Sequence, residues 1–119
     1  LADRENKSDL IAGLDLDVLD KAVSDILIDL SRRETKNSSI DFAELFVNEL
    51  KKNGFNLLHR PHRQAGFAVL KAPDIPSVLI EMGFISNNDD LNKLTSSIFQ
   101  ENLMNSIAMV IEKYFKSKK

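Results

Sequence analysis

Apolar residues near the start of the chain recur at the spacing of a helix. Between residues 19 and 30 they fall at intervals of 4, 3, 1 and 3, which places them on one face of a helix. Asp17 precedes this stripe and is a suitable N-terminal cap. Arg32 and Arg33 follow it, where their charge suits the partial negative charge of a helix C-terminus. We therefore expect one helix here, with an apolar face made of Leu19, Val23, Ile26, Leu27 and Leu30.

A second apolar stripe follows a polar connector at residues 35–39, in which Ser38 or Ser39 is expected to cap the next helix. The stripe ends near Asn53–Gly54, a pair typical of a helix C-terminus. Two helices joined by a short polar segment predict an α-hairpin. Its second helix would bury Phe42, Phe46 and Leu50, with Ala43 and Val47 beside them.

The pattern changes after Leu57. Residues 67–70 and 77–80 are short apolar runs on either side of a turn with two prolines, and each predicts a β-strand. Residues 87–90 offer several N-terminal caps for a short helix carrying Leu91 and Leu94. The last helix shows the most regular stripe in the chain, formed by Phe99, Leu103, Ile107, Val110, Ile111 and Tyr114.

Two strands among several helices do not close a stable sheet, because a two-stranded sheet is marginal by itself. The pattern therefore indicates an α/β fold of which this chain supplies a part. The chain opens on a polar, helix-like segment without an initiating Met, so we expect a piece of a longer protein, in which any export signal would lie upstream.

Composition narrows the function only slightly. The 119 residues are 43% hydrophobic and 29% charged, as in ordinary globular domains, and the formal net charge of -2 indicates no nucleic acid partner. No apolar stretch approaches the roughly 20 residues of a membrane span. Cys is absent, which excludes disulfides, thiol catalysis and zinc sites built on Cys.

One carboxylate, Glu81, stands in the apolar run 78–85. An unpaired buried carboxylate is costly, so such a residue is paired, exposed at a strand end, or functional. Ligands of open α/β sheets bind beyond the carboxyl ends of the strands, where Glu81 would lie. Position alone leaves a functional acid and an ordinary strand-end acid both open.

The segment Gln64–Asn87, which contains Ile80-Glu81-Met82-Gly83-Phe84-Ile85-Ser86-Asn87, resembles the final catalytic block of zinc-dependent N-acetylmuramoyl-L-alanine amidases. More narrowly, it is similar to the cell-division amidases of the AmiA/AmiB/AmiC type from Gram-negative bacteria. The opening Leu1-Ala2-Asp3-Arg4-Glu5-Asn6 resembles the point where those amidases insert a helical regulatory segment.

The resemblance implies metal-assisted hydrolysis in the periplasm. Zn2+ would polarise the amide between the lactyl group of N-acetylmuramic acid and L-alanine in peptidoglycan, and lower the pKa of its bound water. Glu81 would act as general base and then general acid. The fold implied is the C-terminal part of a twisted-sheet domain with helices on both faces. The family's His, Glu and His zinc ligands would lie N-terminal to Leu1, so the 119 residues alone are expected to be inactive.

Two further groups of residues are candidate metal ligands. His59 and His62 stand three apart, but Pro61 between them argues against one helical face, and we interpret them as part of a basic loop. In the division amidases a glutamate from the insertion can block the zinc. Glu5 is the preferred candidate for this inhibitory ligand, with Glu34 as the alternative and an exposed helical glutamate as the ordinary reading of both.

These inferences divide the chain into the end of an amidase-domain helix (1–12), an inserted helical regulatory segment (13–56) and the C-terminal part of the catalytic domain (57–119). The expected function is daughter-cell separation, autoinhibited by the insertion and switched on by an activator protein. Two rivals remain open: a non-catalytic helical interaction module, and a self-contained zinc enzyme using His59, His62 and Glu81.

Overall fold

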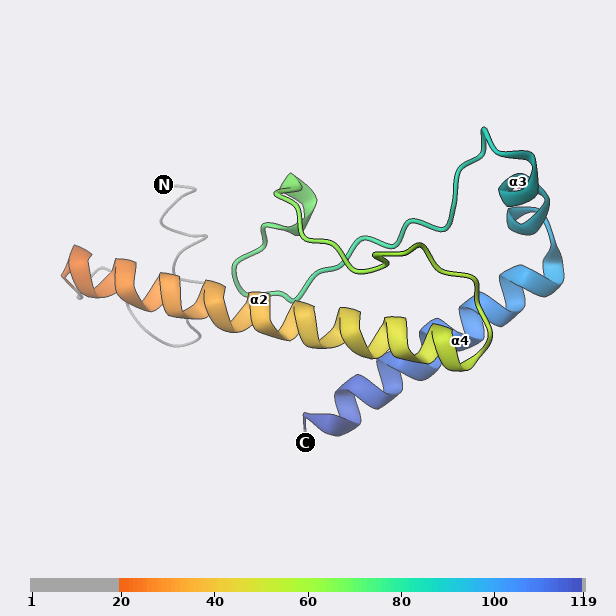
Figure 1. Ribbon diagram of the computed structural model, residues 1–119. Coiled ribbons are helices and arrows are strands. Elements are labelled where there is room, and N and C mark those ends of the chain that lie inside the picture. Colours follow the sequence, from red (N-terminus) through yellow and green to blue (C-terminus); the bar gives the residue numbers. More distant parts are fainter. Residues whose placement is uncertain (1–19, 119) are drawn as a thin grey trace. The chain divides into compact units, whose positions relative to one another are not determined.

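One continuous helix, α2 (Lys21–Lys52), dominates the first part of the structure, a computed structural model that describes residues 20–118 (Figure 1). The predicted α-hairpin is therefore wrong. No glycine or proline stands between Gly13 and Gly54, so nothing in the connector forces the backbone out of the helix. Ser39 does not cap a second helix; its hydroxyl donates to the Thr35 carbonyl at 3.0 Å, a bond that serines make inside helices.

The C-terminus of α2 is closed where the sequence predicts it. Gly54 has a φ of 78°, its N–H donates to the Lys51 carbonyl at 3.2 Å, and the Phe55 N–H donates to the Leu50 carbonyl at 3.0 Å. This pair of bonds is the Schellman arrangement, which requires a left-handed residue that glycine adopts without strain. Phe55 then packs beside Leu50 in the same apolar cluster.

Neither predicted strand forms within residues 20–118. Residues 68–70 make a single 3-10 turn, η1 (Ala68–Leu70), and residues 77–80 are irregular. A strand needs neighbouring strands to pair its backbone groups, and no part of the described chain supplies one. The sheet expected from the sequence is thus not seen in these residues.

Both C-terminal helices match their predictions. Helix α3 (Asn88–Leu94) is capped by Asn87, whose side chain accepts from the Asp90 N–H. Helix α4 (Ser97–Ser117) is capped by Ser96, whose side chain accepts from the Phe99 N–H. These oxygens satisfy backbone donors that have no partner within the first turn of a helix.

The described residues fall into two compact units. The first holds residues 20–40 and 65–78, and the second holds 41–64 and 79–118. In the first unit, the Ser77 N–H donates to the Ser39 hydroxyl at 2.9 Å, which fastens the loop after η1 to the middle of α2. Ile28 is the buried apolar residue of this unit.

The core of the second unit lies between the last three turns of α2 and one face of α4. Its buried apolar members are Phe46, Leu50, Leu103 and Val110. Two edge-to-face aromatic pairs extend it, Phe42 with Tyr114 and Phe55 with Phe99, with ring centroids 5.4 and 5.9 Å apart. Each such pair adds about 0.5–1.5 kcal/mol to what burial contributes.

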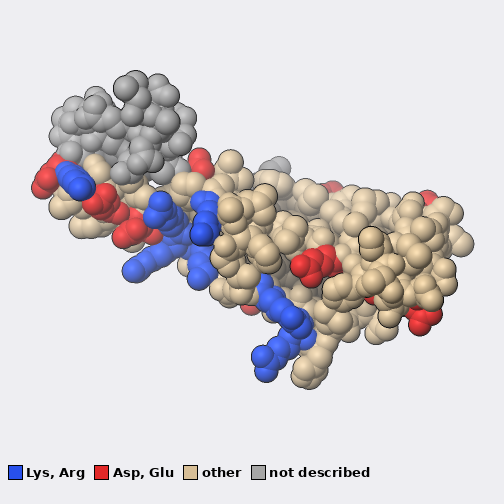
Figure 2. Space-filling model, turned by 90° about the horizontal axis from the view of Figure 1, so that it is seen from above, with Lys and Arg blue, Asp and Glu red and all other residues tan. Residues whose placement is uncertain are grey.

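Basic and acidic side chains both occur on the face shown in Figure 2, in keeping with the formal net charge of -2. Among residues 20–118, no helix combines the length and apolar character that crossing a bilayer would require.

Candidate functional site

Glu81 lies in an irregular segment that leads from the core of the second unit to α3. Ile80, just before it, is half-buried and packs against the apolar cluster of α2 and α4. Leu79 and Glu81, on either side of Ile80, are both exposed. Ile80 is thus the point at which this stretch contacts the core, and Glu81 next to it is exposed.

The chain turns sharply just after Glu81. Gly83 has a φ of 135°, in the region that L side chains rarely adopt. The Phe84 N–H donates to Asp90 Oδ2 at 3.0 Å, and the Asn87 N–H donates to the Phe84 carbonyl at 3.0 Å. Asn87 Oδ1 in turn accepts from the Asp90 N–H at 3.0 Å. The segment that carries Glu81 is therefore bonded directly to the first turn of α3.

The surroundings of Glu81 are apolar, as the sequence predicts, but they are not buried. Met82 is 53% exposed, Phe84 is 59% exposed and Ile85 is 77% exposed. A contiguous exposed apolar segment marks a surface that another element covers. The described residues thus present Glu81 on an uncovered apolar edge.

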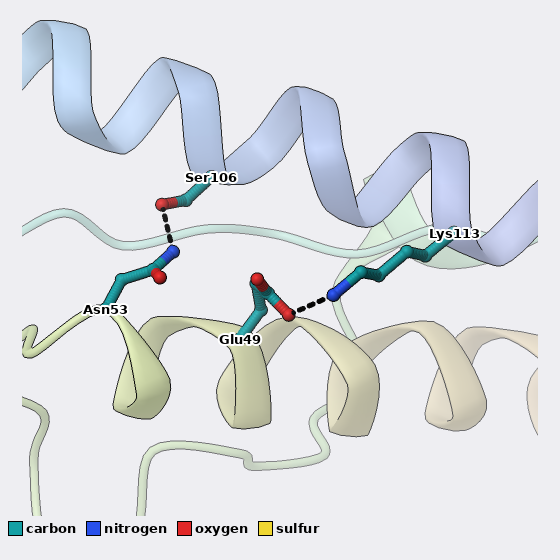
Figure 3. A network of polar contacts seen from close by, with 4 residues as sticks. All are labelled: Glu49, Asn53, Ser106 and Lys113. Carbon is teal, nitrogen blue, oxygen red and sulfur yellow. Dashed lines mark hydrogen bonds and ion pairs between the residues drawn. The ribbon is translucent and has the colours of Figure 1, made fainter.

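A polar network joins α2 to α4 inside the second unit (Figure 3). Lys113 Nζ donates to Glu49 Oε2 at 2.7 Å, and Asn53 Nδ2 donates to Ser106 Oγ at 2.9 Å. Glu49 and Ser106 are both buried. The hydrogen bond from Lys113 holds the pKa of the Glu49 carboxyl below its ordinary value of 4.5, against the opposing effect of burial.

The sequence pattern does not predict this network, although it indicates that the Glu49 side chain is buried. Glu49 follows Phe42 by seven positions and Phe46 by three, so it continues the buried stripe of α2, whereas Asn53 is exposed just past the end of that helix. A carboxylate on such a stripe needs a cation opposite it, and the cation comes from Lys113, 64 positions along the chain.

The other predicted site residues are scattered. His59 and His62 lie in a loop, as expected, and Glu34 is exposed in the interior of α2. Glu5 falls outside the described residues. Residues 20–118 contain no group of three or more His, Cys, Asp or Glu that could hold a metal ion. Within the described residues, the structure therefore does not bring His59, His62 and Glu81 together as a metal site.

Comparison with known proteins identifies the chain. Residues 6–113 match the family described as N-acetylmuramoyl-L-alanine amidase. The chain belongs to this amidase family. Its relatives include the N-acetylmuramoyl-L-alanine amidase AmiC of Escherichia coli O6:H1, 42% identical over 116 residues, and AmiA of Escherichia coli K12, 33% identical over 116 residues. The probable amidase AmiB of Haemophilus influenzae is 29% identical over 106 residues.

The chain is matched almost completely, whereas its relatives are matched only in part. The alignments cover 97% of this chain with AmiC and with AmiA, and 87% with AmiB. They cover 27%, 39% and 24% of those three proteins. Both the Glu81 segment and the α2–α4 network lie inside the region that matches the amidase family.

Proposed function

We propose that this chain is the C-terminal portion of a periplasmic peptidoglycan hydrolase that acts in daughter-cell separation. Its substrate is the amide between the lactyl group of N-acetylmuramic acid and L-alanine. The supporting observation is the family match over residues 6–113, which includes Glu81 and the turn that anchors it.

In this proposal Glu81 is the general base. Its carboxylate takes a proton from the water that attacks the amide carbonyl carbon, and returns that proton to the amine of L-alanine as the carbon–nitrogen bond breaks. The exposed position of Glu81, at the end of a segment anchored on both sides, suits a group that must reach a polymeric substrate. A positioned base of this kind contributes about 10²–10⁴-fold to a rate.

Residues 20–118 do not fit a zinc site, because they hold no group of three metal-binding side chains. We propose that the zinc ion expected for an amidase of this type is held by residues outside that range, in the complete catalytic domain. The exposed apolar segment around Glu81 supports this division, since Leu79, Met82 and Phe84 offer an edge for further strands of a twisted sheet to cover.

The helical segment 13–56 is the proposed regulator, between a short N-terminal part (1–12) and the catalytic part (57–119). Within it, α2 exposes Val23, Ile26 and Leu30, at spacings of three and four, on one face. An exposed apolar stripe of this kind suits an activator helix. We propose that Glu5, with Glu34 as the alternative, blocks the zinc until the activator binds.

The test uses the complete protein that carries these 119 residues. We expect it to release stem peptides from purified murein in a zinc-dependent way, and to stop doing so when a chelator removes the metal. The matched comparison is the same protein with Glu5→Gln, which should release stem peptides faster in the absence of an activator. Binding of murein or of a helical partner without any amide cleavage would instead support the non-catalytic interaction module.

A further inference from the structure

Asp90 reaches back from α3 to the segment that carries Glu81. In many helices the side chain at the third position bonds to the N–H of the capping residue itself. Here the N–H of the cap, Asn87, is already bonded to the Phe84 carbonyl at 3.0 Å. The Asp90 carboxylate is directed instead to the Phe84 N–H, three residues after Glu81, at 3.0 Å.

The backbone at Gly83 also lies close to the Asp90 carboxylate. A Cβ placed on Gly83 would lie 3.3 Å from both Cγ and Oδ2 of Asp90, which is tighter than most real contacts of a Cβ. The φ of 135° at Gly83 is also strained for any other residue. The backbone two residues after Glu81 therefore runs directly against the Asp90 carboxylate.

The other side of Glu81 is held by packing. Ile80 contacts the apolar cluster between α2 and α4, so its backbone is fixed by the core. Glu81 itself is exposed, and within residues 20–118 no hydrogen bond or ion pair holds its carboxylate. Its location thus depends on the backbone anchors before and after it, which are Ile80 on one side and the Asp90 bond on the other.

We propose that Asp90 is a positioning residue for Glu81. The proposal rests on the proposed function, in which Glu81 is the base. The carboxylate of Asp90 fixes the turn at residues 83–84 through a charge-assisted bond to a backbone N–H, which is stronger than a neutral one. Without it, the turn relaxes and Glu81 moves relative to its water and substrate. A displacement of about 1 Å costs on the order of 10²-fold in rate.

The first experiment is Asp90→Ala in the complete protein, with a soluble muropeptide that contains the lactyl–L-alanine amide. We expect kcat to fall roughly 10–100-fold while KM and bound zinc stay unchanged. Asp90→Asn should recover most of the loss, because its amide oxygen still accepts from the Phe84 N–H. The matched control is Asp89→Ala, which removes the same charge from an exposed neighbour in the same turn and should leave kcat unchanged.

The second experiment repeats Asp90→Ala in a Glu81→Gln background. If Asp90 acts through Glu81, little rate remains for it to influence, and kcat should fall by less than about threefold. The same loss in both backgrounds means a general structural role and overturns the proposal, as does an unchanged kcat in Asp90→Ala alone. Should Asp90→Ala fail to fold, Asp90→Glu carries the same test, since the extra methylene group moves the carboxylate away from the Phe84 N–H while keeping its charge in the first turn of α3.

The assignment of Glu81 as the base and the positioning role of Asp90 can be overturned independently of each other. Full activity in Glu81→Gln overturns the assignment of the base, whatever Asp90 does. A normal loss in Glu81→Gln together with additive effects of the two changes leaves the base in place and removes only the positioning role.

Discussion

The Lys113 ammonium and the buried Glu49 carboxylate form a 2.7 Å ion pair that joins α4 to α2. The hydrogen bond from Lys113 lowers the pKa of Glu49 below 4.5 in the folded protein. A carboxyl whose folded pKa is depressed stabilises the fold above its unfolded pKa and loses that contribution as the pH falls through the folded value. The α2–α4 contact should therefore weaken in acid, as the pH falls below about 4.5.

Amide hydrogen exchange of residues 41–52 and 97–117, measured against pH in the complete protein, checks this. Glu49→Gln should remove the acid-dependent loss of protection. The matched control is Glu112→Gln. Lys116 also lowers the pKa of Glu112, but both side chains are mostly exposed and lie on the same helix. Glu112→Gln should therefore have little effect on amide protection. Equal effects of the two changes would contradict a special role for the buried pair.

Local signals predict the helix ends well. Asn87 caps α3 and Gly54 closes α2 as predicted, because each of these functions needs only the residue and its immediate neighbours. The predicted connector at residues 35–39 is wrong because its local signals do not decide between a loop and a helix. Its polar residues are compatible with both a loop and a helix, and Ser39 is held in the helix by contacts with Thr35 and Ser77.

Contacts between distant residues are what the sequence does not reveal. Glu49 meets a lysine 64 positions away, and the strands expected at 67–70 and 77–80 depend on partners that residues 20–118 do not contain. Glu81 stands out from the sequence, through its apolar neighbours and the family resemblance. Asp90 does not, because its bond to Phe84 appears only once the turn at Gly83 is seen.

Replacing Gly54 by Ala should destabilise the C-terminus of α2. Its φ of 78° costs an L residue about 1–2 kcal/mol, although nothing lies within 4 Å of the added methyl group. Gly66→Ala is the control, since its Cβ also meets open space and its φ is not left-handed. Thermal unfolding of the complete protein should show a lower Tm for the first variant only. Equal Tm values would exclude strain at Gly54.

Truncating Leu103 should reveal how much the α2–α4 core contributes. This side chain is 4% exposed, and removal of a buried leucine side chain costs about 2–5 kcal/mol. Ile98→Ala, on the same helix but 71% exposed, should change the free energy of unfolding by less than about 0.5 kcal/mol. Denaturant unfolding of both variants checks this. A similar loss in the two would mean that the face of α4 bearing Ile98 is also packed.

The proposed autoinhibition predicts a gain of activity. Glu5→Gln in the complete protein should raise the rate of murein hydrolysis without activator roughly 5–150-fold, the range that a coupling energy of a few kcal/mol allows. Glu34→Gln should leave this rate unchanged if Glu5 is the blocking residue. The opposite result would assign the block to Glu34, and no increase in either variant would remove both glutamates from this role.

The most direct test of the account is the rate of lactyl–L-alanine amide cleavage by Glu81→Gln in the complete protein. Glutamine keeps the size of the side chain but cannot take up the proton, so we predict a loss of about 10²–10⁴-fold in kcat with zinc content and KM unchanged. Glu101→Gln, from the exposed surface of α4, provides the control for loss of a glutamate. Activity in Glu81→Gln equal to that of the unaltered protein would contradict the central claim that Glu81 is the base.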